Sequence, residues 1–311
     1  MHSSITELTG FSHLTDLPCW QLCHAGATVV VSNYGAHVLH YQAASQQPSD
    51  INNPPPALLK VDDVSALTQS PRLWLSPIAV WQQQMPIRGG VPICWPWFGK
   101  VDPNLLASLA PETVAALKLP NHGLVRTRVW QMNDQRITAD GVEIEFSIVV
   151  DDIPWTEQAV TLRYQVRLTH ELSLTLICDA DIAQQAALHS YFSVSDSRTS
   201  RVQPLPANFY DKVSDSQQQS NDDTLVFCGE IDRVYKNTAP LLELNDGKNQ
   251  THLLQQGHDA SVLWNPAAEK AATSADIPTE QWSQFVCVES ARLTTRPAPL
   301  KLVQIIRPVI A

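Results

Sequence analysis

Apolar and polar residues alternate with a period of two through the middle of the chain. In 142–150 (VEIEFSIVV), apolar residues take every second position and glutamate or serine residues lie between most of them. The alternation continues through 159–169 (AVTLRYQVRLT) and 171–178 (ELSLTLIC), which only His170 separates. Period two is typical of antiparallel strands with one face on a core and one in water. We expect three consecutive strands here, with a bend or bulge at His170.

Most of the remaining chain also favours strand. Further strand-like runs lie at 27–32, 36–42, 128–132, 261–264, 285–290 and 300–307. Helix is predicted in 103–118, where Pro111 starts a second helical turn after a break at Ala110. Segments 43–56, 211–223 and 266–281 are rich in Pro, Ser or Gln or poor in large apolar residues, and are predicted as loops. Many strands without βαβ alternation predict one all-β domain over residues 1–311, a large β-sandwich or supersandwich.

Composition excludes several classes of protein. The 21 basic and 31 acidic residues give a net charge of −10, which disfavours non-specific binding to nucleic acid. No stretch approaches the ~18 apolar residues of a membrane helix, and the first residues do not resemble a signal peptide. We therefore expect a cytoplasmic protein without membrane contact. Cys19, Cys23 and His24 lack the second ligand pair usual in zinc sites, so no metal is expected.

Four segments place ionisable side chains beside Gly, Pro or aromatic residues. They are 86–100 (PIRGGVPICWPWFGK), 121–126 (NHGLVR), 186–192 (AALHSYF) and 286–290 (VCVES). The paired glycines after Arg88 let the backbone approach a ligand, and Trp95 and Trp97 offer flat apolar walls for sugar rings. Glu289 lies in a strand with two apolar faces, where burial raises the pKa of an unpaired carboxyl group.

Each of these side chains also has a structural interpretation. A single histidine in a strand is more often a hydrogen-bonded structural residue than a catalyst, and a strand glutamate usually faces water. Arg88 alone could be a surface residue or could brace the Trp95–Trp97 loop. The residues by themselves therefore leave open whether the β-sandwich carries an acid–base site.

The order of these and further sequence blocks along the chain is more informative than any single residue. IRGGVPICWPWFG, NHGLVR, ALHSYFSV, YDKV, DRVY, WNP and FVCVES resemble the blocks of the D-hexose-6-phosphate mutarotases, within the aldose 1-epimerase (galactose mutarotase-like) superfamily. The resemblance extends from about Gly35 to Arg307. It implies a single antiparallel β-supersandwich with few short helices and an open cleft on one concave sheet. The implied reaction interconverts the α and β anomers of hexose 6-phosphates without a metal or organic cofactor.

The resemblance also implies roles for individual residues. The matching blocks make His189 and Glu289 catalytic, and make substrate-binding residues of Arg88, His122, Arg126 and Asp211. Glu289 is expected to take the proton of the C1 hydroxyl, and His189, as an imidazolium with a pKa near ~6.5, to protonate the ring oxygen. His122 and Asp211 are expected to hold sugar hydroxyls. Arg88, then Arg126 and Lys100, are expected to meet the phosphate.

Two departures from the family pattern and three alternatives remain. The segment from Lys100 to Pro120 is an insertion near the expected cleft, and the HG block reads HGLVR. The alternatives are an aldose 1-epimerase of free sugars, a non-catalytic carbohydrate-binding protein, and a cupin-like metal enzyme, which would need a His-x-His pair that this sequence lacks. The expected partner is a small sugar phosphate, with the protein a monomer or weak dimer.

Overall fold

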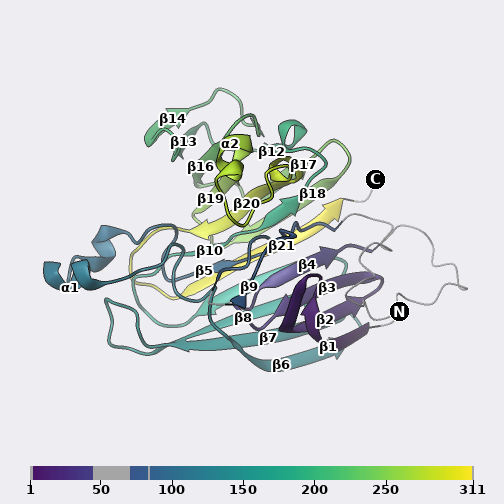
Figure 1. The fold of residues 1–311 in the computed structure, drawn as a ribbon, viewed down its shortest axis with the longest axis horizontal. Helices are drawn as coiled ribbons and strands as arrows, with labels where there is room; N and C mark the ends of the chain where they lie inside the picture. Colours follow the sequence, from purple (N-terminus) through teal and green to yellow (C-terminus); the bar gives the residue numbers. More distant parts are fainter. Residues whose placement is uncertain (1–2, 45–70, 83–84, 310–311) are drawn as a thin grey trace, which may run out of the picture.

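The computed structural model describes residues 3–44, 71–82 and 85–309, and most of its regular structure is antiparallel sheet (Figure 1). A four-stranded sheet has the order β1 (Ser3–Phe11), β2 (Leu14–His24), β3 (Ala27–Ser32), β4 (Val38–Gln42). A nine-stranded sheet has the order β15 (Leu225–Val226), β12 (Arg201–Gln203), β17 (Leu241–Asn245), β18 (Gln250–Gln256), β21 (Leu300–Val309), β9 (Leu172–Cys178), β8 (Val160–Leu168), β7 (Gly141–Val150), β6 (Gln131–Thr138).

An eight-stranded sheet completes the fold. Its order is β14 (Ser216–Gln219), β13 (Asn208–Asp211), β16 (Ile231–Lys236), β19 (Ala260–Asn265), β20 (Phe285–Arg292), β10 (Ala186–Leu188), β5 (Ile93–Cys94), with β11 (Tyr191–Ser193) also paired to β20. Helices are short: α1 (Pro111–Ala116), α2 (Ala267–Ala272), and the 3-10 turns η3 (Pro103–Leu106), η4 (Ser197–Thr199) and η5 (Trp282–Gln284). In the described part of the chain, no helix is long and apolar enough to cross a membrane.

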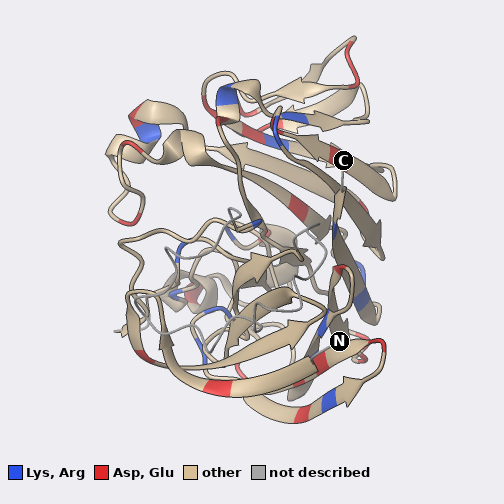
Figure 2. Cartoon of the chain, turned by 90° about the vertical axis from the view of Figure 1, so that its right-hand side faces the viewer, with Lys and Arg blue, Asp and Glu red and all other residues tan. Residues whose placement is uncertain are grey.

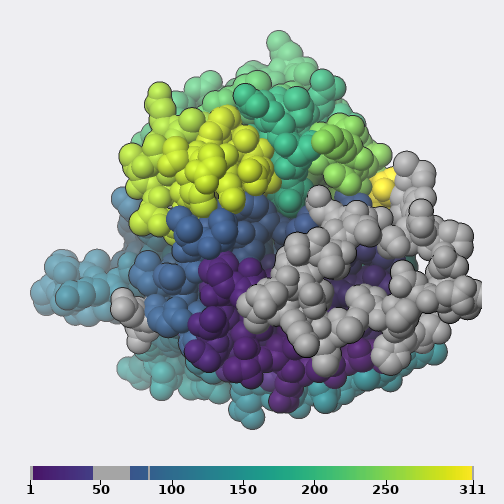
Figure 3. All heavy atoms as spheres, turned by 45° about the vertical axis from the view of Figure 1, so that its right-hand side comes forward, coloured from purple at the N-terminus to yellow at the C-terminus, as the bar shows by residue number. Residues whose placement is uncertain are grey.

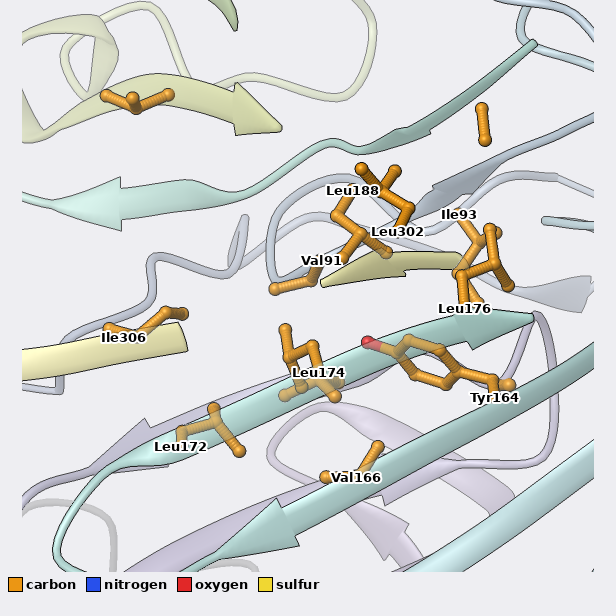
Figure 4. Packing of buried hydrophobic residues seen from close by; sticks show 14 of the residues in the cluster. Val91, Ile93, Tyr164, Val166, Leu172, Leu174, Leu176, Leu188, Leu302 and Ile306 are labelled. Carbon is orange, nitrogen blue, oxygen red and sulfur yellow. The ribbon is translucent and has the colours of Figure 1, made fainter. Parts of the chain in front are cut away.

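The nine-stranded sheet packs one face against both other sheets. Cross-strand pairing puts four buried side chains in a row on that face: Leu302, Leu176, Tyr164 and Phe146. Leu188 of the eight-stranded sheet lies beside Leu302 at one end of this row (Figure 4), and Trp20 of the four-stranded sheet packs edge-on against Phe146 at the other, with ring centroids 5.4 Å apart. Burying each such side chain stabilises the fold by about 1.5–3 kcal/mol. This shared core holds the sheets as layers of one sandwich.

The alternating runs form strands as predicted. Runs 142–150, 159–169 and 171–178 are β7, β8 and β9, with only residues 169–171 between the last two. The runs 27–32, 36–42, 261–264, 285–290 and 300–307 lie within β3, β4, β19, β20 and β21 or overlap them by all but a few residues. The all-β fold class is confirmed. The predicted helical segment 103–118 is also confirmed, as η3 and α1 separated at residues 107–110.

Three local predictions need correction. Residues 211–223 are not a loop, because β13 and β14 form a hairpin there. Residues 266–281 contain helix α2. The strand predicted over 128–132 begins only at Gln131. In the first two cases polar, Gln- or Ala-rich sequence is ordered by pairing within the β13–β14 hairpin or by packing of α2 against η5, which composition does not report. Most of the predicted loop 43–56 lies outside the described residues.

Candidate active site

Strand register places His189 opposite Glu289. Strands β10 and β11 are interrupted at residues 189–190, yet both pair with β20 in one continuous register, through Leu188↔Ser290 and Tyr191↔Cys287. Side chains on directly opposed residues project from the same face of a sheet. His189 and Glu289 therefore share the outer face, away from the nine-stranded sheet, and Nε2 of His189 lies 3.3 Å from Oε1 of Glu289.

Burial controls the protonation of this pair. The side chain of Glu289 is 1% exposed and that of His189 is 10% exposed. Burial raises the pKa of Glu289 well above its ordinary value and lowers the pKa of His189 well below 6.5. The neighbouring His122, Arg88 and Arg126 lower the pKa of His189 further. The expectation of an imidazolium with an ordinary pKa is therefore wrong, because desolvation favours the neutral ring.

The pair retains unused hydrogen-bonding capacity. Oε2 of Glu289 and Nδ1 of His189 are buried and have no hydrogen-bond partner among the described residues. The His189 ring stacks on Tyr191, with centroids 4.8 Å apart and planes 10° apart, so its orientation is fixed. Most buried polar groups in proteins are paired, so an unpaired one needs an explanation, and a role in binding or catalysis is one such explanation. These two atoms are therefore candidate contacts for substrate oxygens.

His122 lies on the far side of His189, with ring centroids 5.4 Å apart. Burial, with the nearby charges of Arg126, Lys212 and Arg88, lowers the pKa of His122 to about 3, so its ring is neutral. The backbone N–H of Gly99 donates to Nδ1, 3.3 Å away, which leaves the ring hydrogen on Nε2. His122 is thus a neutral hydrogen-bond donor.

Gly123 lets the His122 turn approach the sheet. A Cβ on Gly123 would lie 2.0 Å from the carbonyl oxygen of Trp95, and its φ is +81°. His122 itself has a φ of +64°, which is uncommon for a residue with a side chain. The N–H of Leu124 donates to the same Trp95 carbonyl at 2.8 Å. The HG pair is therefore required to bring the imidazole into the site.

Arg88 reaches the site but is already engaged. Its Nε donates to Oδ2 of Asp276 at 2.9 Å, and its Nη1 donates to the hydroxyl of Tyr191 at 2.7 Å. Figure 3 shows the segment around 266–284, in yellow-green, lying directly against the blue segment that contains residues 71–100. Arg88 therefore joins these two segments and braces the tyrosine under His189.

The glycines after Arg88 serve packing and do not open space for a ligand. A Cβ on Gly89 would lie 2.5 Å from the carbonyl oxygen of Trp74, and one on Gly90 would lie 2.2 Å from that of Val38. The buried His37 is 2.7 Å from the Gly89 carbonyl through its Nε2. The predicted approach of this backbone to a ligand is replaced by close backbone–backbone contact.

The two predicted aromatic walls are core residues. Trp95 and Trp97 are fully buried, and their indole N–H groups donate to Oε1 of Gln184 and the carbonyl of Pro120, respectively. The aromatic rings that line the site are different. Phe98 meets the ring of His122 at 4.9 Å, and Trp264 meets that of His189 at 6.2 Å. Sequence alone could not separate these four because all have aromatic, Gly- or Pro-rich neighbours.

Asp211 is not brought to the His189–Glu289 pair. Its register partner Arg233 pairs in turn with Leu263, which points into the core, so Asp211 lies on the other face of the sheet. There its Oδ2 is 3.4 Å from Nε of Arg233, and its Oδ1 accepts two backbone N–H groups. The next residue, Lys212, occupies the site instead. A period of two makes a shift of one residue decisive.

Lys212 and Asp232 were not identified from the sequence. Nζ of Lys212 lies 3.3 Å from Oδ1 of Asp232 and 5.3 Å from the centroid of the Phe98 ring. Both charges act on Glu289: Lys212 lowers the pKa of this carboxyl and Asp232 raises it, in each case less than burial does. The YDKV and DRVY blocks contained both residues, but only the strand register shows which of them face the pair.

Arg126 contributes positive charge without a carboxylate partner. Its Nη2 donates to the carbonyl of Asn121 at 2.8 Å, and within the described residues it forms no ion pair. Its charge nevertheless acts on His122 and His189. Figure 2 shows acidic and basic residues interspersed along strands and loops, and the molecule as a whole has a net charge of −10. The positive charge of Arg126 is therefore a local feature of the site. Arg126 adds a positive charge to the site that no carboxylate among the described residues pairs with.

A separate groove lies on the nine-stranded sheet, away from the candidate site. It has a volume of about 390 Å³ and is lined by Thr199, Arg201, Gln203, Glu243, Asn245 and Gly247. These residues belong to or flank strands β12 and β17 of the nine-stranded sheet. The candidate site is therefore identified by its paired and unpartnered ionisable groups, and it does not coincide with this groove.

The layered antiparallel fold and the buried His–Glu pair define a β-supersandwich with a pair of ionisable groups on the outer face of one sheet. The model of the aldose 1-epimerase family matches residues 18–301, and the chain belongs to this family. The chain is 31% identical over 246 residues to an Escherichia coli protein with the provisional name glucose-6-phosphate 1-epimerase, covering 76% of this chain and 79% of that protein. A Haemophilus influenzae protein of the same provisional name is 30% identical over 224 residues, covering 71% and 73% of the two chains.

Solved structures agree on the fold. A Salmonella typhimurium protein with the provisional name mutarotase superimposes with a TM-score of 0.77 at 25% identity, over 95% of this chain and 91% of that one. A galactose 1-epimerase from Lactobacillus acidophilus has a TM-score of 0.64 at 13% identity, over 99% of both chains. The predicted galactose mutarotase-like supersandwich is thereby confirmed.

Proposed function

We propose that this protein interconverts the α and β anomers of D-hexose 6-phosphates, with glucose 6-phosphate as the representative substrate. The observation that carries the proposal is the buried His189–Glu289 pair. The two side chains face each other, and each retains one polar atom without a partner among the described residues. Family membership supplies the reaction class, and the provisional names of the relatives support the phosphorylated substrate. Residues 1–311 are proposed to act as one domain.

Ring opening needs one proton acceptor at the C1 hydroxyl and one proton donor at the ring oxygen. The shifted pKa values of the two groups favour a neutral pair, which contains a single proton. Moving that proton from Glu289 to His189 leaves the count unchanged and creates a carboxylate base and an imidazolium acid. In that form Glu289 takes the hydroxyl proton while His189 protonates the ring oxygen. Reclosure on the other face of the carbonyl carbon reverses both transfers and returns the pair to its starting state.

His122 and Lys212 are proposed to hold the sugar. The Nε2–H of His122 can donate to a ring hydroxyl without competing for the proton of the reaction, because its ring is neutral. Lys212 lies beside Glu289, where its charge favours the carboxylate form needed for catalysis. Asp232 replaces Asp211 as the carboxylate on this face.

Arg126 is proposed as the principal phosphate ligand, with Arg88 second. Arg88 shares its charge with Asp276 and its donors with Tyr191, whereas Arg126 donates to a neutral carbonyl. Charge-assisted Arg–phosphate hydrogen bonds contribute roughly 1.5–3 kcal/mol each. Because a phosphate dianion does not cross bilayers, the substrate stays where it is phosphorylated, and we propose a cytoplasmic enzyme, monomeric or weakly dimeric.

The test is the rate of anomer exchange, measured by magnetisation transfer between the two H1 signals of glucose 6-phosphate, free glucose and free galactose. We expect kcat/KM to be highest for glucose 6-phosphate. Arg126→Met should raise KM for the phosphate about tenfold and change turnover of free glucose little. The matched control is Arg163→Met. Arg163 lies on strand β8 of the nine-stranded sheet and pairs with Asp179. Faster exchange of free sugars than of glucose 6-phosphate would make the protein an aldose 1-epimerase of free sugars.

A further inference from the structure

One polar side chain interrupts the aliphatic core beneath the candidate site. Gln304 of β21 is fully buried, between Leu302 and Ile306 on the inner face of the nine-stranded sheet. Figure 4 labels these two neighbours among the aliphatic side chains of the sandwich, with Leu188 of the opposite sheet beside Leu302. An amide at such a position has to find all its partners within the protein.

The partners of Gln304 are the immediate chain neighbours of the two catalytic candidates. The hydroxyl of Ser190, which follows His189, donates to Oε1 of Gln304. Nε2 of Gln304 donates to Oγ of Ser290 at 3.0 Å and to the carbonyl of Val288 at 3.3 Å, which flank Glu289. A single amide thus binds both strands that carry the pair, from the opposite face of their sheet.

Between β10 and β11 the ladder to β20 is interrupted, although the strands on both sides pair with β20 in one register. Residues 189–190 form this interruption. The backbone bonds there are Val288 N–H to the Ser190 carbonyl at 3.2 Å, His189 N–H to the Pro92 carbonyl at 3.0 Å and Ser190 N–H to the Leu188 carbonyl at 3.1 Å. A local displacement of the backbone at this interruption would move the His189 side chain relative to Glu289.

The same hydrogen-bond chain continues away from the site. Ser290 donates to Oε1 of Gln255 at 2.8 Å, Ser261 donates to the same oxygen at 3.0 Å, and the hydroxyls of Thr238 and Ser261 are 2.8 Å apart. All four side chains are buried. Buried polar networks of this kind cost desolvation and are best known for specifying one arrangement of the chain.

We propose that Gln304 is a positioning residue of the reaction. From the nine-stranded sheet, its amide holds Ser190 and Ser290 in place. It thereby keeps the His189 and Glu289 side chains opposite each other on the outer face of the eight-stranded sheet. It touches neither the substrate nor the reacting atoms. The proposal rests on the proposed function for its kinetic consequences, but its structural consequence, the placement of the His189 ring, does not depend on the substrate.

The first test is Gln304→Met, which keeps the volume and removes the amide. We expect kcat for anomer exchange of glucose 6-phosphate to fall by roughly ten- to a hundredfold, as for a small displacement of reacting groups, with KM within about twofold of the parent value. The matched control is Gln184→Met, a fully buried glutamine bonded to Trp95 and to two loop carbonyls. It should lose thermal stability and keep kcat.

A second variant separates positioning from stability. In Ser190→Ala/Ser290→Ala/Gln304→Met the two hydroxyls that lose Gln304 as a partner in the first variant are also removed, so thermal stability should recover in part. The proposal expects kcat to stay low. Recovery of kcat together with stability would overturn it, as would a folded Gln304→Met protein with full kcat. If Gln304→Met does not fold, the triple variant decides by the same criterion.

A third measurement does not use activity. The ¹⁵N chemical shifts of the His189 ring report its tautomer and its contact with Glu289. They should change in Gln304→Met and stay at the parent values in Gln184→Met. Unchanged His189 signals in Gln304→Met would overturn the positioning role. If the parent protein exchanges no sugar anomers at all, the proposed function fails, and the ring signals still decide whether Gln304 positions His189.

Discussion

Glu289 and His189 owe their chemistry to burial. A carboxyl group whose pKa is raised and an imidazole whose pKa is lowered both prefer to be neutral, and at 3.3 Å they hold one proton between them. Neither group can titrate independently at this separation. The reaction needs this one-proton state. On lowering the pH, the pair leaves this state when His189 gains a second proton, at its lowered pKa. On raising the pH, the pair leaves it when Glu289 loses the shared proton, at its raised pKa.

The pH dependence of kcat tests the shared proton. Both limits lie away from the ordinary histidine value of 6.5: the acidic limit moves down with the pKa of His189, and the basic limit follows the raised pKa of Glu289. We expect kcat with saturating glucose 6-phosphate to show no inflection from His189 near pH 6.5, since kcat reports groups in the bound complex and burial lowers the pKa of His189 well below that value. An apparent pKa near 6.5 in the kcat profiles of both glucose 6-phosphate and free glucose, which carries no titrating phosphate, would show that His189 titrates as an independent imidazole.

At the scale of elements, Arg88 links the loop before β5 to the segment after α2. Its bonds to Asp276 and Tyr191 fix the tyrosine on which His189 stacks. The hydroxyl of Ser76 donates to the Asp276 carbonyl at 2.7 Å, which ties the same segment a second time. This arrangement gives Arg88 a positioning task that binding a phosphate alone would not require.

Arg88→Lys tests that task. Lysine keeps the charge but cannot make both bonds of the planar guanidinium. We expect kcat to fall by about tenfold with both glucose 6-phosphate and free glucose, while Arg126→Met affects the phosphate alone. The comparison needs both substrates in one assay series. A rise in KM confined to glucose 6-phosphate in Arg88→Lys would restore Arg88 as the principal phosphate ligand.

How much the sequence predicts differs between elements. Strands β7, β8 and β9 were predictable because their alternation reflects one buried face. The burial of Glu289 was predictable because its strand is apolar on both faces. The β13–β14 hairpin was not, because its Gln-rich residues are exposed and its order comes from pairing with β16. Asp211 was misplaced for a related reason: the motif identifies the segment, but only register decides whether Asp211 or Lys212 faces Glu289.

At the scale of the whole molecule, the eight-stranded sheet uses its two faces differently. Its inner face contributes Leu188, Val288 and Leu263 to the common core, and its outer face carries the ionisable pair. Substitutions of the pair therefore remove chemistry without removing core volume. Because burial disfavours charge, Glu289→Gln should leave thermal stability unchanged or raise it. The gain should grow as the pH rises above the ordinary glutamate pKa of 4.5, where the unfolded parent chain loses the Glu289 proton and the folded protein keeps it.

The central claim is that His189 and Glu289 act as one unit, and a double-mutant cycle on anomer exchange of glucose 6-phosphate tests it most directly. Glu289→Gln and His189→Asn should each lower kcat by at least about a hundredfold, with melting profiles that show a folded protein. The double variant should be no slower than the slower single variant, because either change already removes the shared proton transfer. If either single variant keeps most of its activity, or if the two losses multiply in the double variant, the pair does not act as the proposed unit.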